Sequence, residues 1–302
     1  MKLLAIVNGA SAGGKTARRW PEIEQALRSA GVEFDAVFTE GPAHASELAV
    51  EALGSGREAI AACGGDGTLS EVVNGLIDER GGARAPGTLL AIIPSGTGGD
   101  FRKTLGINAD PQAAAELIAR GRSRSIDAGL IEYADESPPR RFINIASCGV
   151  GYEVDRRVND LKFKPGRFAY GLVSVYSIIA YGSVPARVTV DGERTEGTFS
   201  SIALANGRCF GGGMQIAPKA DPSDGLLDVI LSSTSRTRSI LGARHLYDGT
   251  HLDRPGSTML RGTEIEIEPL GDSRMGFDVD GEALGFAPAT ITALPGVLDI
   301  IC

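Results

Sequence analysis

The segment Gly64-Gly65-Asp66-Gly67-Thr68 lies between two apolar runs, residues 59–63 before it and residues 69–77 after it. The first run predicts a buried strand, and the second, with apolar residues three and four positions apart, predicts an amphipathic helix. The glycines therefore lie at a helix N-terminus, whose free backbone N–H groups suit a phosphate group. Because an aspartate in such a turn requires a nearby cation, the segment predicts a site for a metal-bound nucleotide. An ordinary strand-to-helix turn is the alternative.

A second glycine-rich segment, residues 9–16, follows the first predicted strand and fits the pattern GxxxxGK[ST]. In a P-loop of this type, Lys15 would contact the β- and γ-phosphates and Thr16 would bind magnesium. The chain has 41 glycines, which makes chance matches common. In addition, the strand end that bears an aspartate is the turn at residues 64–68, whose shape differs from the one expected to support magnesium in a P-loop protein. We therefore expect a phosphate-contacting loop of another kind.

Strands and helices alternate through the first part of the chain. The predicted strands are residues 3–8, 32–39, 59–63 and 89–94, and the predicted helices are 16–30, 43–53, 69–79 and 111–120, with a loop and turn at 96–103. This alternation predicts βαβ units and a mostly parallel sheet. Ligands of such sheets bind at the carboxyl ends of the strands, and all four ends here are rich in small polar residues.

From about residue 123 the pattern changes to strands joined by hairpin-type turns, such as Val190-Asp191-Gly192-Glu193. The predicted strands are residues 141–146, 186–191, 197–205, 226–232, 262–269, 275–279 and 289–294, and helices are predicted near 168–181 and 236–247. We expect a β-rich second domain, with the active site in the cleft between the two domains.

Composition narrows the function. The chain has 302 residues and a net charge of −8, which disfavours binding to nucleic acid. Its four cysteines form no CxxC pair, which is typical of a reduced, cytoplasmic protein and argues against structural zinc.

The uncharged stretch 168–184 is a poor membrane span and predicts a buried helix. Alternatively, it offers an apolar surface to a lipid chain, with basic residues just before it for anionic headgroups.

Six segments together resemble a known family. They are residues 6–15, 38–45, 64–72, 93–101, 216–228 and 280–282. In this order and spacing they resemble the diacylglycerol kinase catalytic-domain family, which includes bacterial lipid kinases and, more distantly, sphingosine and ceramide kinases. The sequence departs from the family pattern where Gly9 replaces a proline and where Ser70 and Gly99 replace asparagines. These departures bear on nucleotide or acceptor specificity.

The resemblance implies an α/β fold, with a Rossmann-like parallel-sheet nucleotide domain at residues 1–124 and a β-sandwich-like domain at residues 125–302. It implies a kinase that uses ATP and Mg2+ to phosphorylate the hydroxyl of a lipid alcohol, such as diacylglycerol, at a membrane surface. The protein would be cytoplasmic or peripheral to the inner face of the membrane. The resemblance leaves open whether it forms a homodimer. The implied nucleotide-binding residues are Asn8, Gly9, Ala10, Ser11, Ala12, Thr39, Gly65, Asp66, Gly67, Thr68, Leu69, Ser70, Glu71 and Thr97.

The resemblance also implies roles in catalysis. Asp66 would organise magnesium, and Glu282 would be the base that takes the proton of the acceptor hydroxyl. From the residues alone, the segment 279–282 is equally typical of a hairpin turn, because residues 190–193 repeat it as Val-Asp-Gly-Glu. Asp221 and Asp224, with the carbonyl of Leu226, resemble a second, structural magnesium site, for which a solvated acidic loop is the alternative.

Rival functions are disfavoured by missing motifs. An NAD kinase should carry a TPTGSTAY-like stretch and an Asn-Glu pair, and the sequence contains neither. A phosphofructokinase should carry the segment TIDND, which is also missing. A catalytically inactive regulator that binds lipid or nucleotide is a further alternative. The presence of both Asp66 and Glu282 argues against it.

Overall fold

The computed structural model describes residues 2–95, 99–149, 152, 182–234 and 244–302. The chain divides into two compact units: unit 1 is Met1–Ala128 with Leu294–Cys302, and unit 2 is Gly129–Ala293. The segment 168–184, which we considered as a buried or lipid-facing helix, lies almost wholly outside the described residues. Within the described part of the chain, no helix is long and apolar enough to cross a membrane.

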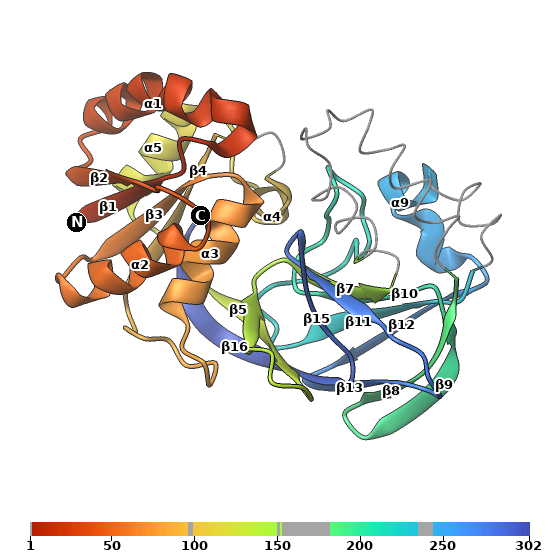
Figure 1. Cartoon of the computed structure of the whole chain (residues 1–302). Coiled ribbons are helices and arrows are strands. Elements are labelled where there is room, and N and C mark those ends of the chain that lie inside the picture. The colour runs from red at the N-terminus through yellow and green to blue at the C-terminus, as the bar shows by residue number, and fades with distance from the viewer. Residues whose placement is uncertain (1, 96–98, 150–151, 153–181, 235–243) are drawn as a thin grey trace. The chain divides into compact units, whose positions relative to one another are not determined.

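Unit 1 is built on a parallel sheet (Figure 1). Its strands are β1 (Leu3–Val7), β2 (Phe34–Phe38), β3 (Ala59–Gly64) and β4 (Leu89–Pro94), in the order β2-β1-β3-β4, and the end of β16 (Ala289–Ile301) adds to β4. β3 is buried along its whole length, as expected for a central strand of a parallel sheet covered on both faces. The predicted α/β class with a mostly parallel sheet in the first domain is therefore confirmed.

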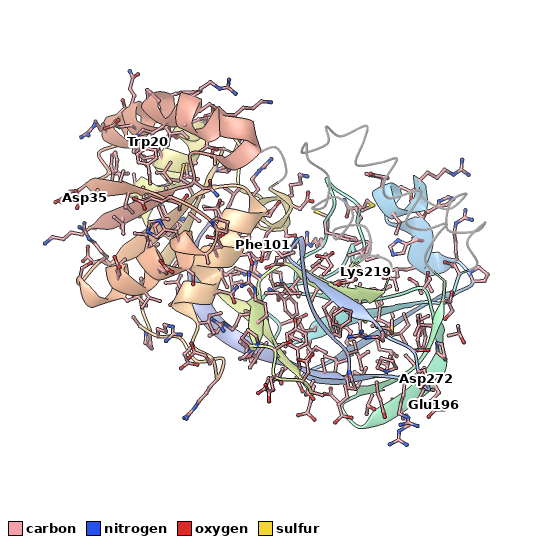
Figure 2. The ribbon with its side chains drawn as sticks, in the orientation of Figure 1. Trp20, Asp35, Phe101, Glu196, Lys219 and Asp272 are labelled. Carbon is pink, nitrogen blue, oxygen red and sulfur yellow. The ribbon has the colours of Figure 1, made fainter. Side chains whose placement is uncertain are left out.

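Helices cover this sheet: α1 (Ser11–Ser29), α2 (His44–Gly54), α3 (Asp66–Leu76), α4 (Asp100–Thr104) and α5 (Pro111–Arg120). Helices α1 and α5 pack together, as do α2 and α3. The α1 side of the core centres on Trp20, labelled in Figure 2, which packs edge-on against Phe34 and Phe38 at ring centroid distances of 6.3 and 5.6 Å. These contacts join the middle of α1 to both ends of β2.

Unit 2 holds two antiparallel sets of strands with one apolar core between them. One sheet has the order β12-β11-β10-β7-β14-β15, and the other set includes β16-β13-β8-β9 and the pair β5-β6. The strands are β5 (Ser123–Tyr133), β6 (Arg140–Phe142), β7 (Ile145–Gly149), β8 (Val184–Val190), β9 (Glu193–Phe199), β10 (Ser201–Ala205), β11 (Leu227–Ser232), β12 (Ser257–Gly262), β13 (Glu264–Pro269), β14 (Gly276–Val279) and β15 (Glu282–Phe286). Two short helices, α9 (Arg244–Asp248) and η1 (Thr250–Asp253), also belong to unit 2. The predicted β-sandwich-like second domain is confirmed.

The division between the units differs from the one that we placed after residue 124. It falls within β5, between Ala128 and Gly129, and the last nine residues return to unit 1. The cause is β16, whose first residues pair antiparallel with β13, while Asp299 and Ile300 pair parallel with β4. One long strand therefore serves both units.

Several predicted elements also differ from the structure. The predicted strand 141–146 is two strands, β6 and β7, and the predicted strand 197–205 is β9 and β10, separated at Ser200. The helix predicted from residue 69 begins at Asp66, and part of the predicted loop 96–103 is α4. Strands β5, β12 and β15 were not expected.

Candidate active site

Hydrogen bonds join three strand-end loops of unit 1 at the carboxyl edge of the parallel sheet. Asn8, after β1, donates from Nδ2 to Oγ1 of Thr68 in α3 over 3.1 Å. Thr16 in α1 and Ser95, after β4, share a hydrogen bond of 2.8 Å between their hydroxyl groups. The loops after β1, β3 and β4 are therefore fixed relative to one another, as expected for a ligand site at this edge.

The loop after β1 has an unusual backbone. Ala12, Gly13 and Gly14 have φ values of 52°, 67° and 81°, so regular helix begins only after them. Successive N–H groups in such a conformation form a concavity that suits an anion. Thr16 is fully buried, and its hydroxyl also contacts that of Ser11. Its side chain is thus occupied within the protein and is not placed to bind magnesium as a P-loop threonine would.

The turn at residues 64–68 has one crowded glycine and one open glycine. A Cβ on Gly64 would lie 2.7 Å from the Cβ of Thr68, so no larger residue fits there. A Cβ on the exposed Gly67 would meet nothing within 4 Å. The N-cap residue of α3 is Gly65, which provides no side-chain cap, and this leaves the first backbone N–H groups of the helix available. This is the geometry expected of a phosphate cradle.

The Asp66 side chain reaches the loop after β4. Its carboxylate accepts hydrogen bonds from the backbone N–H groups of Gly99, Asp100 and Phe101, at 2.8, 3.1 and 3.4 Å. Burial raises the pKa of this carboxyl, the nearby Asp100 carboxylate raises it further, and the three N–H donors oppose the rise. Lys103 pairs with Asp100 at 2.5 Å. Asp66 thus anchors the start of α4, and Phe101, labelled in Figure 2, is fully buried beside it.

The remaining predicted nucleotide residues have separate environments. The Glu71 carboxylate accepts a hydrogen bond of 3.1 Å from the N–H of Ala45, so it caps α2. Thr39 extends the sheet edge, because its N–H donates to the Val7 carbonyl over 2.9 Å. Leu69 and Ser70 are buried. Thr97 lies outside the described residues.

Glu282 lies in unit 2, at the first position of β15. It follows a hairpin turn in which Asp280 and Gly281 have positive φ values of 51° and 91°. Its carboxylate pairs with the guanidinium of Arg140 at 2.7 Å, and its side chain is 38% exposed. The hairpin alternative for this segment is therefore what the backbone adopts, and it presents a partly exposed carboxylate.

The loop of Asp221, Asp224 and Leu226 is an acidic turn closed by its own backbone. Asp221 accepts from the N–H of Ser223 at 3.2 Å, and Asp224 accepts from the N–H of Leu226 at 3.1 Å. Asp224 also pairs with Arg261. Among the residues that the structure describes, no group of three His, Cys, Asp or Glu side chains is placed to hold a metal ion.

Sequence reasoning missed three partners. Arg140 pairs with Glu282, and Arg261 pairs with Asp224 and, at 2.8 Å, with the buried Asp228. Ser95 ties the loop after β4 to α1. No local sequence signal identifies such partners, because each lies 30 or more residues away along the chain.

Comparisons with known proteins agree with this geometry. The model of the diacylglycerol kinase catalytic domain matches residues 2–131, and that of the YegS C-terminal NAD kinase beta sandwich-like domain matches residues 144–302. The chain belongs to the diacylglycerol kinase family. By this membership it is a lipid kinase, and the two matched regions follow the parallel sheet of unit 1 and the sandwich of unit 2.

Individual relatives of this lipid kinase match it over nearly the whole chain. A diacylglycerol kinase of Mycobacterium tuberculosis is 30% identical, over 99% of this chain and 94% of the relative. A Pseudomonas aeruginosa protein, "Probable lipid kinase YegS-like", is 31% identical over 99% and 93%. A crystal structure from Bacillus anthracis, assigned as a diacylglycerol kinase, has a TM-score of 0.80 and 26% identity, covering 99% and 96% of the two chains.

Proposed function

We propose that this chain transfers the γ-phosphoryl group of ATP to the primary hydroxyl of a lipid alcohol, with diacylglycerol as the first candidate. The hydrogen-bonded edge of the unit 1 sheet carries the proposal, because three strand-end loops are joined where a parallel sheet binds its ligand, and one of them leads into the uncapped start of α3. Phosphoryl transfer depends mainly on positioning and on neutralising the phosphate charge, which such an edge can supply. A membrane surface would present the acceptor.

The nucleotide would bind through backbone more than through side chains. Phosphate oxygens would approach the loop after β1 and the start of α3, where glycine at position 67 leaves room. Thr39 would lie at the edge of the nucleotide, and Thr97 would add a contact from the loop after β4. The side chains of Leu69, Ser70 and Glu71 would hold α3 in position.

Magnesium would accompany ATP and neutralise its phosphates. Asp66 is a hard oxygen donor of the kind that Mg2+ prefers. A carboxylate offers about four acceptor positions, and three of these are used by backbone N–H groups. Asp66 therefore has one position for a direct or water-mediated contact with the ion. Asp221, Asp224 and the Leu226 carbonyl would form a second, structural magnesium site.

Glu282 would act as the general base. The exposed part of its carboxylate would accept the proton of the lipid hydroxyl, while Arg140 keeps it oriented. Glu282→Gln should lower kcat by about a hundredfold or more, a typical contribution of acid–base catalysis. The matched control is Glu193→Gln, at the same position of the other Val-Asp-Gly-Glu hairpin.

The substrate is tested with γ-labelled ATP and a panel of acceptors in mixed micelles. Diacylglycerol, ceramide and sphingosine are compared with NAD, which represents the rival activity. We expect label in a lipid product, in a reaction that requires Mg2+. Label in NAD alone would refute the lipid assignment, and unchanged turnover of Glu282→Gln would refute the role of the base.

A further inference from the structure

A short segment of unit 2 crosses from one set of strands to the other, and a single carboxylate binds it. Ile143, Asn144 and Ile145 follow β6 and enter β7, and all three are buried, with exposed fractions of 1, 6 and 3%. Their three successive N–H groups donate to the carboxylate of Asp280, at 3.0, 3.1 and 3.1 Å. Asp280 therefore supplies the acceptors that buried backbone N–H groups require.

The carbonyl groups of Ile143 and Asn144 are bound from the turn after β10, and that of Ile145 accepts from the N–H of Asp280 at 3.0 Å. The carbonyl of Ile143 accepts from Nδ2 of Asn206 at 2.7 Å. The carbonyl of Asn144 accepts from the N–H groups of Asn206 and Gly207, at 2.9 and 2.8 Å. With both its donors and its acceptors bound, the crossover has one defined conformation.

The same crossover connects the two sets of strands that carry Arg140 and Glu282. Arg140 is on β6, three residues before the crossover, in the set of strands that contains β5. Glu282 is on β15, two residues after Asp280, in the sheet that contains β7. The 2.7 Å ion pair thus joins two sets of strands whose connecting segment Asp280 holds.

A second hairpin of the same sequence provides an internal comparison. Asp191 and Gly192 repeat the positive φ values, at 47° and 85°, and Val190 pairs with Glu193 as Val279 pairs with Glu282. The Asp191 carboxylate likewise accepts from backbone, at Thr263 and Glu264, both at distances of 2.9 to 3.2 Å. The two aspartates differ in what they hold: Asp191 holds the start of β13, and Asp280 holds the crossover that carries Arg140.

We propose that Asp280 is a positioning residue, whose carboxylate fixes the crossover 143–145 and thereby aligns Arg140 with Glu282. The inference rests on the proposed function, in which Glu282 is the base. It assigns Asp280 no contact with substrate. Asp280 would affect turnover only by keeping Arg140 aligned with Glu282.

The first test needs no substitution. In hydrogen-exchange measurements on the whole protein, the amides of residues 143–145 should be protected as strongly as those of β7. Exchange as fast as that of an open loop would overturn the proposal.

The second test compares Asp280→Asn with Asp191→Asn. Asparagine tolerates the positive φ of both turns and keeps one acceptor oxygen, so both variants should retain the fold. The readout is the NMR signal of the Arg140 side-chain Nε. In Asp280→Asn it should move toward its position in Glu282→Gln, and in Asp191→Asn it should stay at the wild-type position. A wild-type signal in Asp280→Asn would overturn the proposal, whatever the activity.

The third test is a double-mutant cycle on kcat. Asp280→Asn should lower kcat by about tenfold, less than the roughly hundredfold that a 1 Å misplacement of a catalytic group can cost, with the KM for ATP unchanged. In the Glu282→Gln background it should cost no more than about twofold, because residues that act as one unit are not additive. A full tenfold loss in both backgrounds would overturn the proposal. If Glu282→Gln alone leaves turnover intact, the base assignment fails, and the Arg140 signal still decides the role of Asp280.

Discussion

Gly67 offers a substitution that should separate folding from nucleotide binding. It is exposed, it lies within α3, and a Cβ there meets nothing within 4 Å. Because alanine is about 1 kcal/mol more favourable than glycine inside a helix and less so in its first turn, Gly67→Ala should stabilise the protein by about 0.5 kcal/mol. If phosphate approaches this backbone, the added methyl group should weaken ATP binding by about tenfold or more, which is about 1.4 kcal/mol.

The assay measures Tm by calorimetry and ATP affinity by titration on the same preparations. Gly64→Ala is the matched comparison, because its Cβ would lie 2.7 Å from the Cβ of Thr68 and would disturb the hydrogen bond from Asn8. Overpacking of this kind costs about 1–3 kcal/mol, so this variant should lose stability and affinity together. If Gly67→Ala binds ATP as the wild type does, phosphate does not approach the start of α3, and the proposed nucleotide site is refuted.

Three further predictions concern other parts of the chain. Thr16→Val should lower Tm, because Ser95 loses a partner, but should leave the Mg2+ requirement of the reaction unchanged; a steep rise in that requirement would indicate a true P-loop. Mg2+ should raise the Tm of the wild type more than that of Asp221→Asn, and equal increments would remove Asp221 from the proposed metal site. Burial lowers the pKa of His251 below 6.5, so its contribution to stability is present above that pH and is lost as the pH falls toward the folded-state pKa. Tm should therefore fall more for the wild type than for His251→Gln between about pH 7 and 5.5, and parallel curves would contradict this assignment.

The elements of unit 1 could be predicted because their signals are local. Helix α5 has the same bounds as the prediction, 111–120. Its signals are Asp110, which caps it by accepting from Ala113 at 2.9 Å, the proline at its first position, and Gly121 at a φ of 63° after its end. Strand β4 likewise has the predicted bounds, because a short apolar run between polar loops defines both of its ends.

The breaks between strands in unit 2 could not be predicted in this way. Residues 141–146 contain no glycine or proline, yet the chain changes sheets within them because Asp280, more than 130 residues later, binds the backbone there. The two ends of β16 also have different partners, β13 and β4, which no pattern within residues 289–301 encodes. The periodicity of apolar residues indicates which face of a strand is buried. It does not indicate which other strand pairs with that strand in the sheet.

In the candidate site, too, the partners of motif residues lie far away along the chain and have no local sequence signal. This affects how the activity of variants should be interpreted. Three acidic residues within the motifs accept backbone N–H groups from distant segments: Asp66 from α4, Glu71 from α2, and Asp280 from the crossover before β7. Each carboxylate therefore stabilises a loop, whatever chemistry it also performs. Substitution by alanine would leave those N–H groups unpaired, at a cost of about 1–3 kcal/mol each, and a loss of activity would then not distinguish catalysis from folding. Asparagine and glutamine remove the charge but keep one acceptor oxygen, so they disturb the anchored loop less than alanine does. A residue whose amide variant keeps both Tm and turnover acts only as an anchor, whereas one whose amide variant keeps Tm and loses turnover acts in catalysis, either through its own charge or, as proposed for Asp280, by positioning another residue.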